Sequence, residues 1–163
     1  MIATTCTPVL EKCTVLWCRK PWPGHPRGCP NWRHAEGCPP GILPLPRILD
    51  LSQPVWLLVN EYDLGDWAAR MRARHPEWSD AQCRNPRHWQ GTARAQLWRA
   101  VEAWQAEHPD QLVVPCPEAS RVDVTATCAG AGIVLEWPAR IIARQVVLAG
   151  TPTEAMRERL AAP

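Results

Sequence analysis

The stretch "PVWLLVNEYDLGDWAARMRARHP", residues 54–76, changes from one hydrophobic pattern to another at Asp63. Its first part, residues 54–62, is a short apolar run, which predicts a largely buried strand. From Leu64 onward the apolar residues recur at helical spacing, and Asp63 is suited to cap the helix. The helix must end before Pro76, because a residue that precedes proline avoids the α region. A buried strand followed directly by an amphipathic helix predicts a fold with both element types.

A second helix is predicted over "NPRHWQGTARAQLWRAVEAWQAEHP", residues 85–109. Asn85 is a good N-cap, and Pro86 occupies the first helical position, where its missing N–H does no harm. The apolar side chains then recur on one face, which is expected to pack on the sheet. These residues are Trp89, Ala93, Leu97, Val101 and Trp104.

Four shorter segments complete the predicted fold. We expect strands over residues 111–115, 132–138 and 139–150, and a final helix over 153–162 with Thr153 as its cap. The fold class is therefore α+β or α/β, with a small mixed sheet and two main helices. We expect a single domain, 1–163, that consists of a Cys/Pro-rich region over 1–47 and an α/β body over 48–163.

Cysteine usage is the most unusual feature of the composition. The 163 residues include eight cysteines, and the net charge of +2 is too small to indicate nucleic acid by itself. The N-terminal stretch has no basic segment followed by a long apolar run, so no secretory signal is predicted. No segment approaches the roughly 20 apolar residues of a membrane span. We therefore expect a cytoplasmic protein with reduced thiols, in which metal binding is favoured over disulfides.

The cysteines concentrate in "WCRKPWPGHPRGCPNWRHAEGCPP", residues 17–40, which has too many prolines for a helix or strand. Cysteine precedes proline at Cys29, at Cys38 and, far along the chain, at Cys116. Proline after a ligand cysteine fixes the direction in which the chain leaves, and the ferredoxin run also ends in Cys-Pro. Thiolates are soft donors that suit zinc or an iron–sulfur cluster. Metal ligation would supply the ordering that packing cannot give such a loop.

The other cysteines and the histidines have simpler interpretations. Cys6, Cys13 and Cys128 are interpreted as small buried hydrophobic residues. His25 and His34 could complete a zinc site, although His25 is more simply a hydrogen-bond partner of the loop backbone.

Two segments resemble a known group of proteins: "CRKPWPGHPRGCPNWRHAEGCPP" and "CPEASRVDVTATCAGAGIVLEWP". The group comprises small bacterial, archaeal and phage proteins described as cysteine-rich predicted metal-binding proteins, a domain of unknown function. The match includes Cys38-Pro39-Pro40, Glu118-Ala119 and Val122-Asp123-Val124. The resemblance implies metal binding by an iron–sulfur cluster, with a short strand at 122–124 followed by a helix. Many members carry a distal group of closely spaced cysteines, where this chain has Cys116 and, upstream, Cys83.

The first functional hypothesis is one [4Fe–4S] cluster held by Cys18, Cys29, Cys38 and Cys116, with Cys83, Cys128 and His25 in reserve. Four thiolates would close the cluster and favour electron transfer with a redox partner, or a structural role. Three protein ligands would leave one iron open as a Lewis acid for a small-molecule substrate.

Two alternatives remain open. A structural zinc module could bind nucleic acid or a protein partner through the basic N-terminal region and Trp17, Trp22 and Trp32, although these indoles are more simply packing residues. A thiol enzyme would pair Cys83 with His88.

Glu136, within the predicted strand 132–138, is the carboxylate to test for burial, because a buried acid beside a cleft can have a shifted pKa. No membrane partner is expected.

Overall fold

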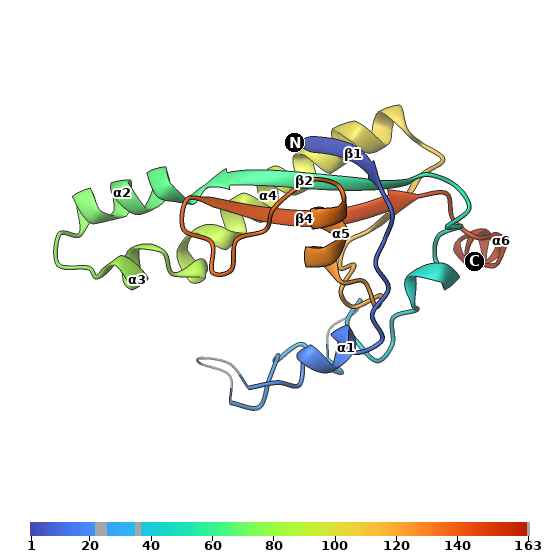
Figure 1. Cartoon of the computed structure of the whole chain (residues 1–163), viewed down its shortest axis with the longest axis horizontal. Helices are drawn as coiled ribbons and strands as arrows, with labels where there is room; N and C mark the ends of the chain where they lie inside the picture. The colour runs from blue at the N-terminus through green and yellow to red at the C-terminus, as the bar shows by residue number, and fades with distance from the viewer. Residues whose placement is uncertain (22–25, 35–36, 163) are drawn as a thin grey trace.

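The chain folds around one four-stranded sheet (Figure 1). The computed structural model describes residues 1–21, 26–34 and 37–162. The strands lie in the order β1-β2-β4-β3, and every neighbouring pair is antiparallel. They are β1 (Ile2–Cys6), β2 (Val55–Asp63), β3 (Leu112–Val114) and β4 (Ile142–Gly150). The α+β class is confirmed, while the strand pairings are all antiparallel rather than of both senses.

The central pair, β2 and β4, explains why these residues form strands. The two strands pair along their whole lengths, from Val55 opposite Gly150 to Asp63 opposite Ile142. Leu57, Leu58 and Val59 in β2 are all fully buried, so both faces of the sheet are covered at this point. Strands buried on both faces read as continuous apolar runs rather than alternating ones, which is the pattern that predicted β2.

The longest helix, α4 (Pro86–Glu107), covers one face of the sheet. It begins as predicted, with the Asn85 side chain accepting a hydrogen bond from the N–H of Arg87. All five residues of the predicted face are buried. Leu97, Val101 and Trp104 pack against Leu58 and Val147 of the sheet. The predicted helix and its contact face are confirmed.

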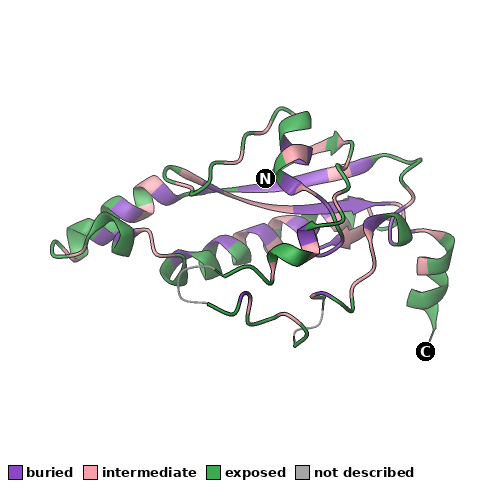
Figure 2. Ribbon diagram, turned by 60° about the horizontal axis from the view of Figure 1, so that its bottom comes forward, coloured by how far each residue is buried: buried purple, intermediate pink, exposed green. Residues whose placement is uncertain are grey.

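The opposite face is covered by α5 (Val124–Gly130) and by the chain around the 3-10 turn η1 (Leu45–Arg47). Leu45, Leu49 and Cys128 are fully buried against this face. Figure 1 shows α4 and α5 on opposite sides of the sheet, and Figure 2 shows that the buried residues concentrate between these layers. The main core therefore lies between the sheet and α5, with a second core under α4.

Besides the short helix α1 (Thr14–Trp17), the helices α2, α3 and α6 lie outside this sandwich. The predicted helix after β2 is α2 (Leu64–Arg74), and Asp63 caps it by accepting from the N–H of Asp66. It projects past the end of the sheet together with α3 (Asp80–Cys83) (Figure 1). The predicted C-terminal helix is α6 (Glu154–Ala161), capped by Thr153. No helix in the described part of the chain has the length and apolar character needed to cross a membrane.

Two details of the sequence analysis were wrong. Residues 132–138 are not a strand but part of the irregular connection between α5 and β4, in which Val134 is 74% exposed and Trp137 is 71% exposed. The strand expected at 122–124 is absent: Asp123 instead caps α5, the helix expected to follow. In addition, the Cys/Pro-rich region 1–47 contains β1, a strand that was not predicted, which pairs with β2.

Candidate metal centre

The segment that follows Cys116 holds both ends of the Cys/Pro-rich loop. We call residues 14–45 the cysteine loop; its first turn is α1 (Thr14–Trp17). At one end the Thr14 hydroxyl, nearly fully buried, donates to the carbonyl oxygen of Glu118 at 2.8 Å. At the other end the N–H of Leu45 donates to the carbonyl oxygen of Ser120 at 2.8 Å. Contacts more than 70 residues apart in sequence thus place Cys116 at the base of the loop.

Inside the loop, the chain returns on itself so that two cysteines meet through their backbones. The N–H of Cys29 donates to the carbonyl oxygen of Cys18 at 2.7 Å. Gly28 makes this approach possible: its φ is +85°, and a Cβ added there would lie 2.5 Å from the Cys18 oxygen. Only glycine combines that dihedral angle with no side chain. Gly28 therefore fixes the relative position of Cys18 and Cys29.

The thiol groups of the loop lie close enough to influence one another's ionisation. The pKa of Cys18 is raised above its ordinary value, first by burial and then by the negative charges of Cys29, Cys38 and Glu118. The pKa of Cys116 is also raised, first by burial and then by the charges of Glu118, Cys38 and Cys18, while Arg94 acts in the opposite direction. Cys18 is thus influenced by Cys29 and Cys38, and Cys116 by Cys38 and Cys18.

Glu118 is the carboxylate that influences both Cys18 and Cys116. Its side chain is exposed to a hollow next to Cys116, yet protein surrounds it on most sides, and this burial raises its pKa. A carboxyl group is favoured in its neutral form where water is partly excluded. A cation placed beside Glu118, Cys18 and Cys116 would relieve the mutual repulsion of their charges.

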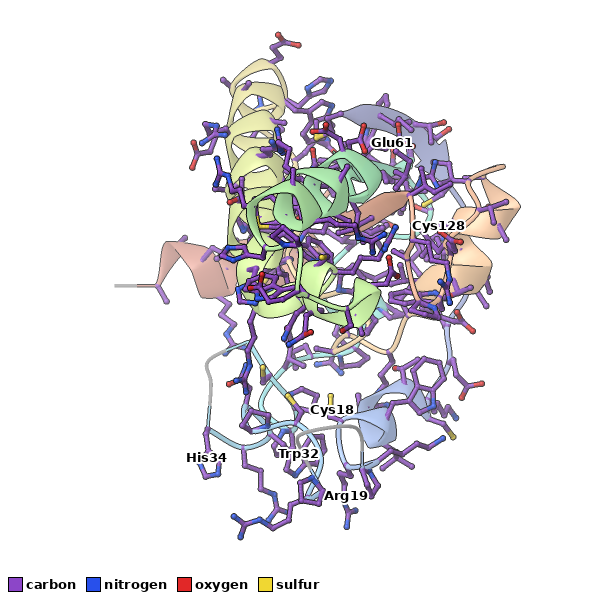
Figure 3. The ribbon with its side chains drawn as sticks, turned by 90° about the vertical axis from the view of Figure 1, so that its left-hand side faces the viewer. Cys18, Arg19, Trp32, His34, Glu61 and Cys128 are labelled. Atoms are coloured by element: carbon purple, nitrogen blue, oxygen red, sulfur yellow. The ribbon has the colours of Figure 1, made fainter. Side chains whose placement is uncertain are left out.

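The donor set fits a soft metal or a cluster in its chemistry. All eight cysteines are free, so none of the four loop ligands is committed to a disulfide. Figure 3 shows Cys18 above Arg19 and Trp32, with other sulfur atoms drawn near it. The four thiols are neighbours rather than a finished coordination sphere: within residues 1–21, 26–34 and 37–162, no three His, Cys, Asp or Glu groups have converged to hold an ion.

The reserve ligands lie elsewhere. Cys83 is fully buried beside Ala68 and Met71, between α2 and α3. Cys128 is fully buried in the core under α5, well separated from Cys18 in Figure 3, which confirms its interpretation as a packing residue. His25, like Trp22, falls outside the described residues.

The two remaining cysteines, Cys6 and Cys13, differ in burial. Cys6 is half-buried against the core, and burial raises its pKa to about 11. Cys13 is exposed, so its interpretation as a buried hydrophobic residue was wrong. The buried position of Cys83 also leaves its sulfur without access to a substrate, which counts against pairing it with the exposed His88 as a thiol enzyme.

A hollow of about 460 Å³ lies next to Cys116, and we call it the Cys116 hollow. Helix α4 lines one side with Gln90, Arg94 and Trp98, and the edge of β4 lines another with Gln145 and Val146. The hollow exists because β3 pairs only with residues 148–150 of β4 and then ends, which leaves the rest of that edge uncovered. Gly37 also lines it, so the cysteine loop closes one side.

No family model, no curated protein and no solved structure matches this chain. The resemblance in the cysteine segments therefore stays an expectation, and the geometry of the site carries the functional argument.

Sequence reasoning missed three residues of the site, Glu118, Arg94 and Gln145. Glu118 follows the Cys-Pro dipeptide at Cys116, and that position was the available signal. Arg94 and Gln145 line the same hollow as Glu118, but only the tertiary fold brings these three residues together. The carboxylate singled out for a burial test, Glu136, is exposed, and its Oε2 accepts a hydrogen bond from the N–H of Arg140.

Proposed function

We propose that this protein carries one thiolate-held metal centre, a [4Fe–4S] cluster, bound by Cys18, Cys29, Cys38 and Cys116. The observation that supports the proposal is that the Cys29 N–H bonds to the Cys18 carbonyl oxygen, while Cys38 influences the pKa of both Cys18 and Cys116. Four soft donors in one place are the ligand set of zinc and of iron–sulfur clusters, and the resemblance in the cysteine segments favours the cluster.

The Cys116 hollow supports a role beyond a structural one. A bound cluster supplies one-electron transfer or, where one iron lacks a protein ligand, a Lewis acid. Cys116 is the one candidate ligand that lines this hollow, so a molecule held there would lie directly beside the centre. Glu118 and Arg94 act on the pKa of Cys116 in opposite directions, Glu118 raising it and Arg94 lowering it.

The test is metal and sulfide analysis of protein purified without oxygen. We expect brown protein with about four iron and four sulfide per chain, as the cluster type requires. Cys29→Ser and Cys38→Ser are each expected to abolish metal binding. Cys13→Ser is the matched control, because Cys13 is an exposed thiol next to the same loop. Metal retained in both loop variants would show that the ligand set is wrong.

The Cys116→Ser variant separates the two versions of the centre. Loss of the cluster would indicate four protein ligands and favour electron transfer. Retention with altered spectroscopic properties would indicate three ligands and an iron open to the hollow.

A zinc module that binds nucleic acid is the second candidate function. The specific observation is that Trp17 is 44% exposed and that Arg19, Lys20, Arg27 and Arg33 are all exposed on the cysteine loop. Exposed indoles stack on bases, and basic side chains contact phosphates. Colourless protein with one zinc per chain and salt-dependent binding to single-stranded oligonucleotides would replace the cluster proposal with this one.

A further inference from the structure

The Cys116 hollow has the dimensions and lining of a small-molecule site. Its volume of about 460 Å³ lies within the range of about 300–1,000 Å³ that is usual for ligand pockets. Gln90, Arg94 and Trp98 follow one another at helical spacing, so a single stripe of α4 faces the hollow. Trp98, Val146 and Leu135 give it apolar walls.

Two ionisable groups line this apolar space without a partner of their own. Arg94 is exposed and takes part in none of the salt bridges found among the described residues, whereas Arg144 is already held by Glu61 and by the carbonyl oxygen of Val134. Glu118 contributes a carboxyl group on the side of Cys116 and likewise takes part in none of those salt bridges.

We propose that the Cys116 hollow binds a small zwitterion with an apolar side chain, of the amino-acid class. Its carboxylate meets the Arg94 guanidinium, and its ammonium group donates to the Glu118 carboxylate. Its side chain lies against Trp98 and Val146. As the substrate of the metal centre this ligand depends on the proposed function, whereas its binding depends only on the walls of the hollow.

Other ligand classes leave part of the site unpaired. A dianion would meet the Glu118 carboxylate, which repels it. A simple amine would leave Arg94 without a partner, and an apolar molecule would leave both Arg94 and Glu118 without hydrogen bonds. Each of these arrangements is unfavourable in a partly dry site.

The test is calorimetric titration of the protein, purified without oxygen, with three matched probes. These are L-phenylalanine, 3-phenylpropanoate, which lacks the ammonium group, and 2-phenylethylamine, which lacks the carboxylate. Because a charge-assisted hydrogen bond is lost in each truncation, we expect both to bind at least about tenfold more weakly than L-phenylalanine. Equal binding of all three probes, or no binding of any, would overturn the proposal.

Two variants locate the ligand. Arg94→Met is expected to bind L-phenylalanine and 2-phenylethylamine with similar affinity, because the partner of the carboxylate is gone. Arg99→Met, an exposed arginine on the same helix, is the matched control and is expected to keep the original preference. An unchanged preference in Arg94→Met would overturn the assignment of Arg94.

Metal content is measured on the same samples, which separates this inference from the proposed function. Selective binding by protein without iron would reject the cluster and retain the ligand site. A cluster without selective binding would retain the proposed function and reject the ligand.

Discussion

The body and the cysteine loop are held together by different forces. The body is an antiparallel sheet with α4 on one face and α5 on the other, and its central strand has consecutive residues fully buried. The described part of the loop is mostly exposed in Figure 2, and Thr14, Gly28 and Pro39 are its buried residues between positions 14 and 40. Burial of apolar surface can stabilise the first region but not the second. The loop is instead positioned by backbone hydrogen bonds, such as those from Cys29 to Cys18 and from Leu45 to Ser120.

This difference shows why a metal would matter to one region and not to the other. A body with its own core folds without a ligand. A loop of turns and prolines gains order from whatever binds its donors, as in small metal-binding domains. Five predictions test or sharpen this division.

The largest effect is expected from Leu57→Ala in β2. Leu57 is fully buried in the main core, so the truncation should lower the free energy of unfolding by roughly 3–5 kcal/mol. Denaturant unfolding followed by circular dichroism measures this change. Leu160→Ala, at a residue 61% exposed on α6, is the control and should change the free energy by less than about 0.5 kcal/mol.

Removal of the metal should affect the cysteine loop and not the body, the opposite of the effect of Leu57→Ala. A chelator should leave the unfolding of the body unchanged and should increase cleavage of the cysteine loop by proteases. If chelation unfolds the body, the two regions are not separately stabilised and the comparison fails.

An intermediate effect is expected from Gly28→Ala. The new Cβ would overlap the Cys18 carbonyl oxygen, so the two cysteine segments must move apart. Metal content per chain should fall several-fold, while the unfolding of the body should not change. Gly132→Ala is the matched control: its φ is +77°, but no other atom lies within 4 Å of the added Cβ. Equal losses of metal in both variants would show that the close approach at Gly28 is unimportant.

The smallest effect is expected from Glu118→Gln, which changes charge and not shape. The Glu118 carboxylate raises the pKa values of Cys18 and Cys116, so its removal should lower both. Thiolates then form at lower pH, and the pH profile of Cys116 alkylation in metal-free protein should move toward acid. Glu102→Gln, at an exposed position on α4, should leave the profile in place.

The raised pKa values of Cys18 and Cys116 also determine how metal binding depends on pH. Metal displaces the thiol protons, so affinity should rise with pH until the raised pKa values are passed, and protons should be released on binding. Competition with a chelator at several pH values measures this trend. An affinity independent of pH would argue against thiolate ligands.

The regular elements of the body could be predicted because their patterns are local. The change of periodicity at Asp63, the capping residues Asn85 and Thr153 and the apolar face of α4 each act within a few residues. The segment 132–138 was predicted incorrectly because its apolar residues resemble a strand, although Val134 and Trp137 point to solvent. The strand β1 is short, rich in threonine and partly exposed, so it carries little hydrophobic signal.

The site could be predicted only where sequence context marks it. Three Cys-Pro dipeptides drew attention to the loop and to Cys116, and the structure shows that Cys38 influences the pKa of Cys116. The Cys116 hollow gave no such signal, because Arg94, Glu118 and Gln145 belong to three distant segments. Their proximity depends on where β3 ends, which is a property of the sheet rather than of a motif.

The attachment of both loop ends to one segment has a consequence for entropy. Thr14 bonds to Glu118 and Leu45 bonds to Ser120, so the cysteine loop is closed before any ligand binds. Closing a long chain segment loses entropy that grows with the logarithm of its length. Here that entropy is already lost when the body folds. A metal that joins Cys18, Cys29 and Cys38 to Cys116 therefore has to order only the shorter chain segments between these cysteines. The folded body thus strengthens metal binding by lowering its entropic cost, without contributing a further ligand.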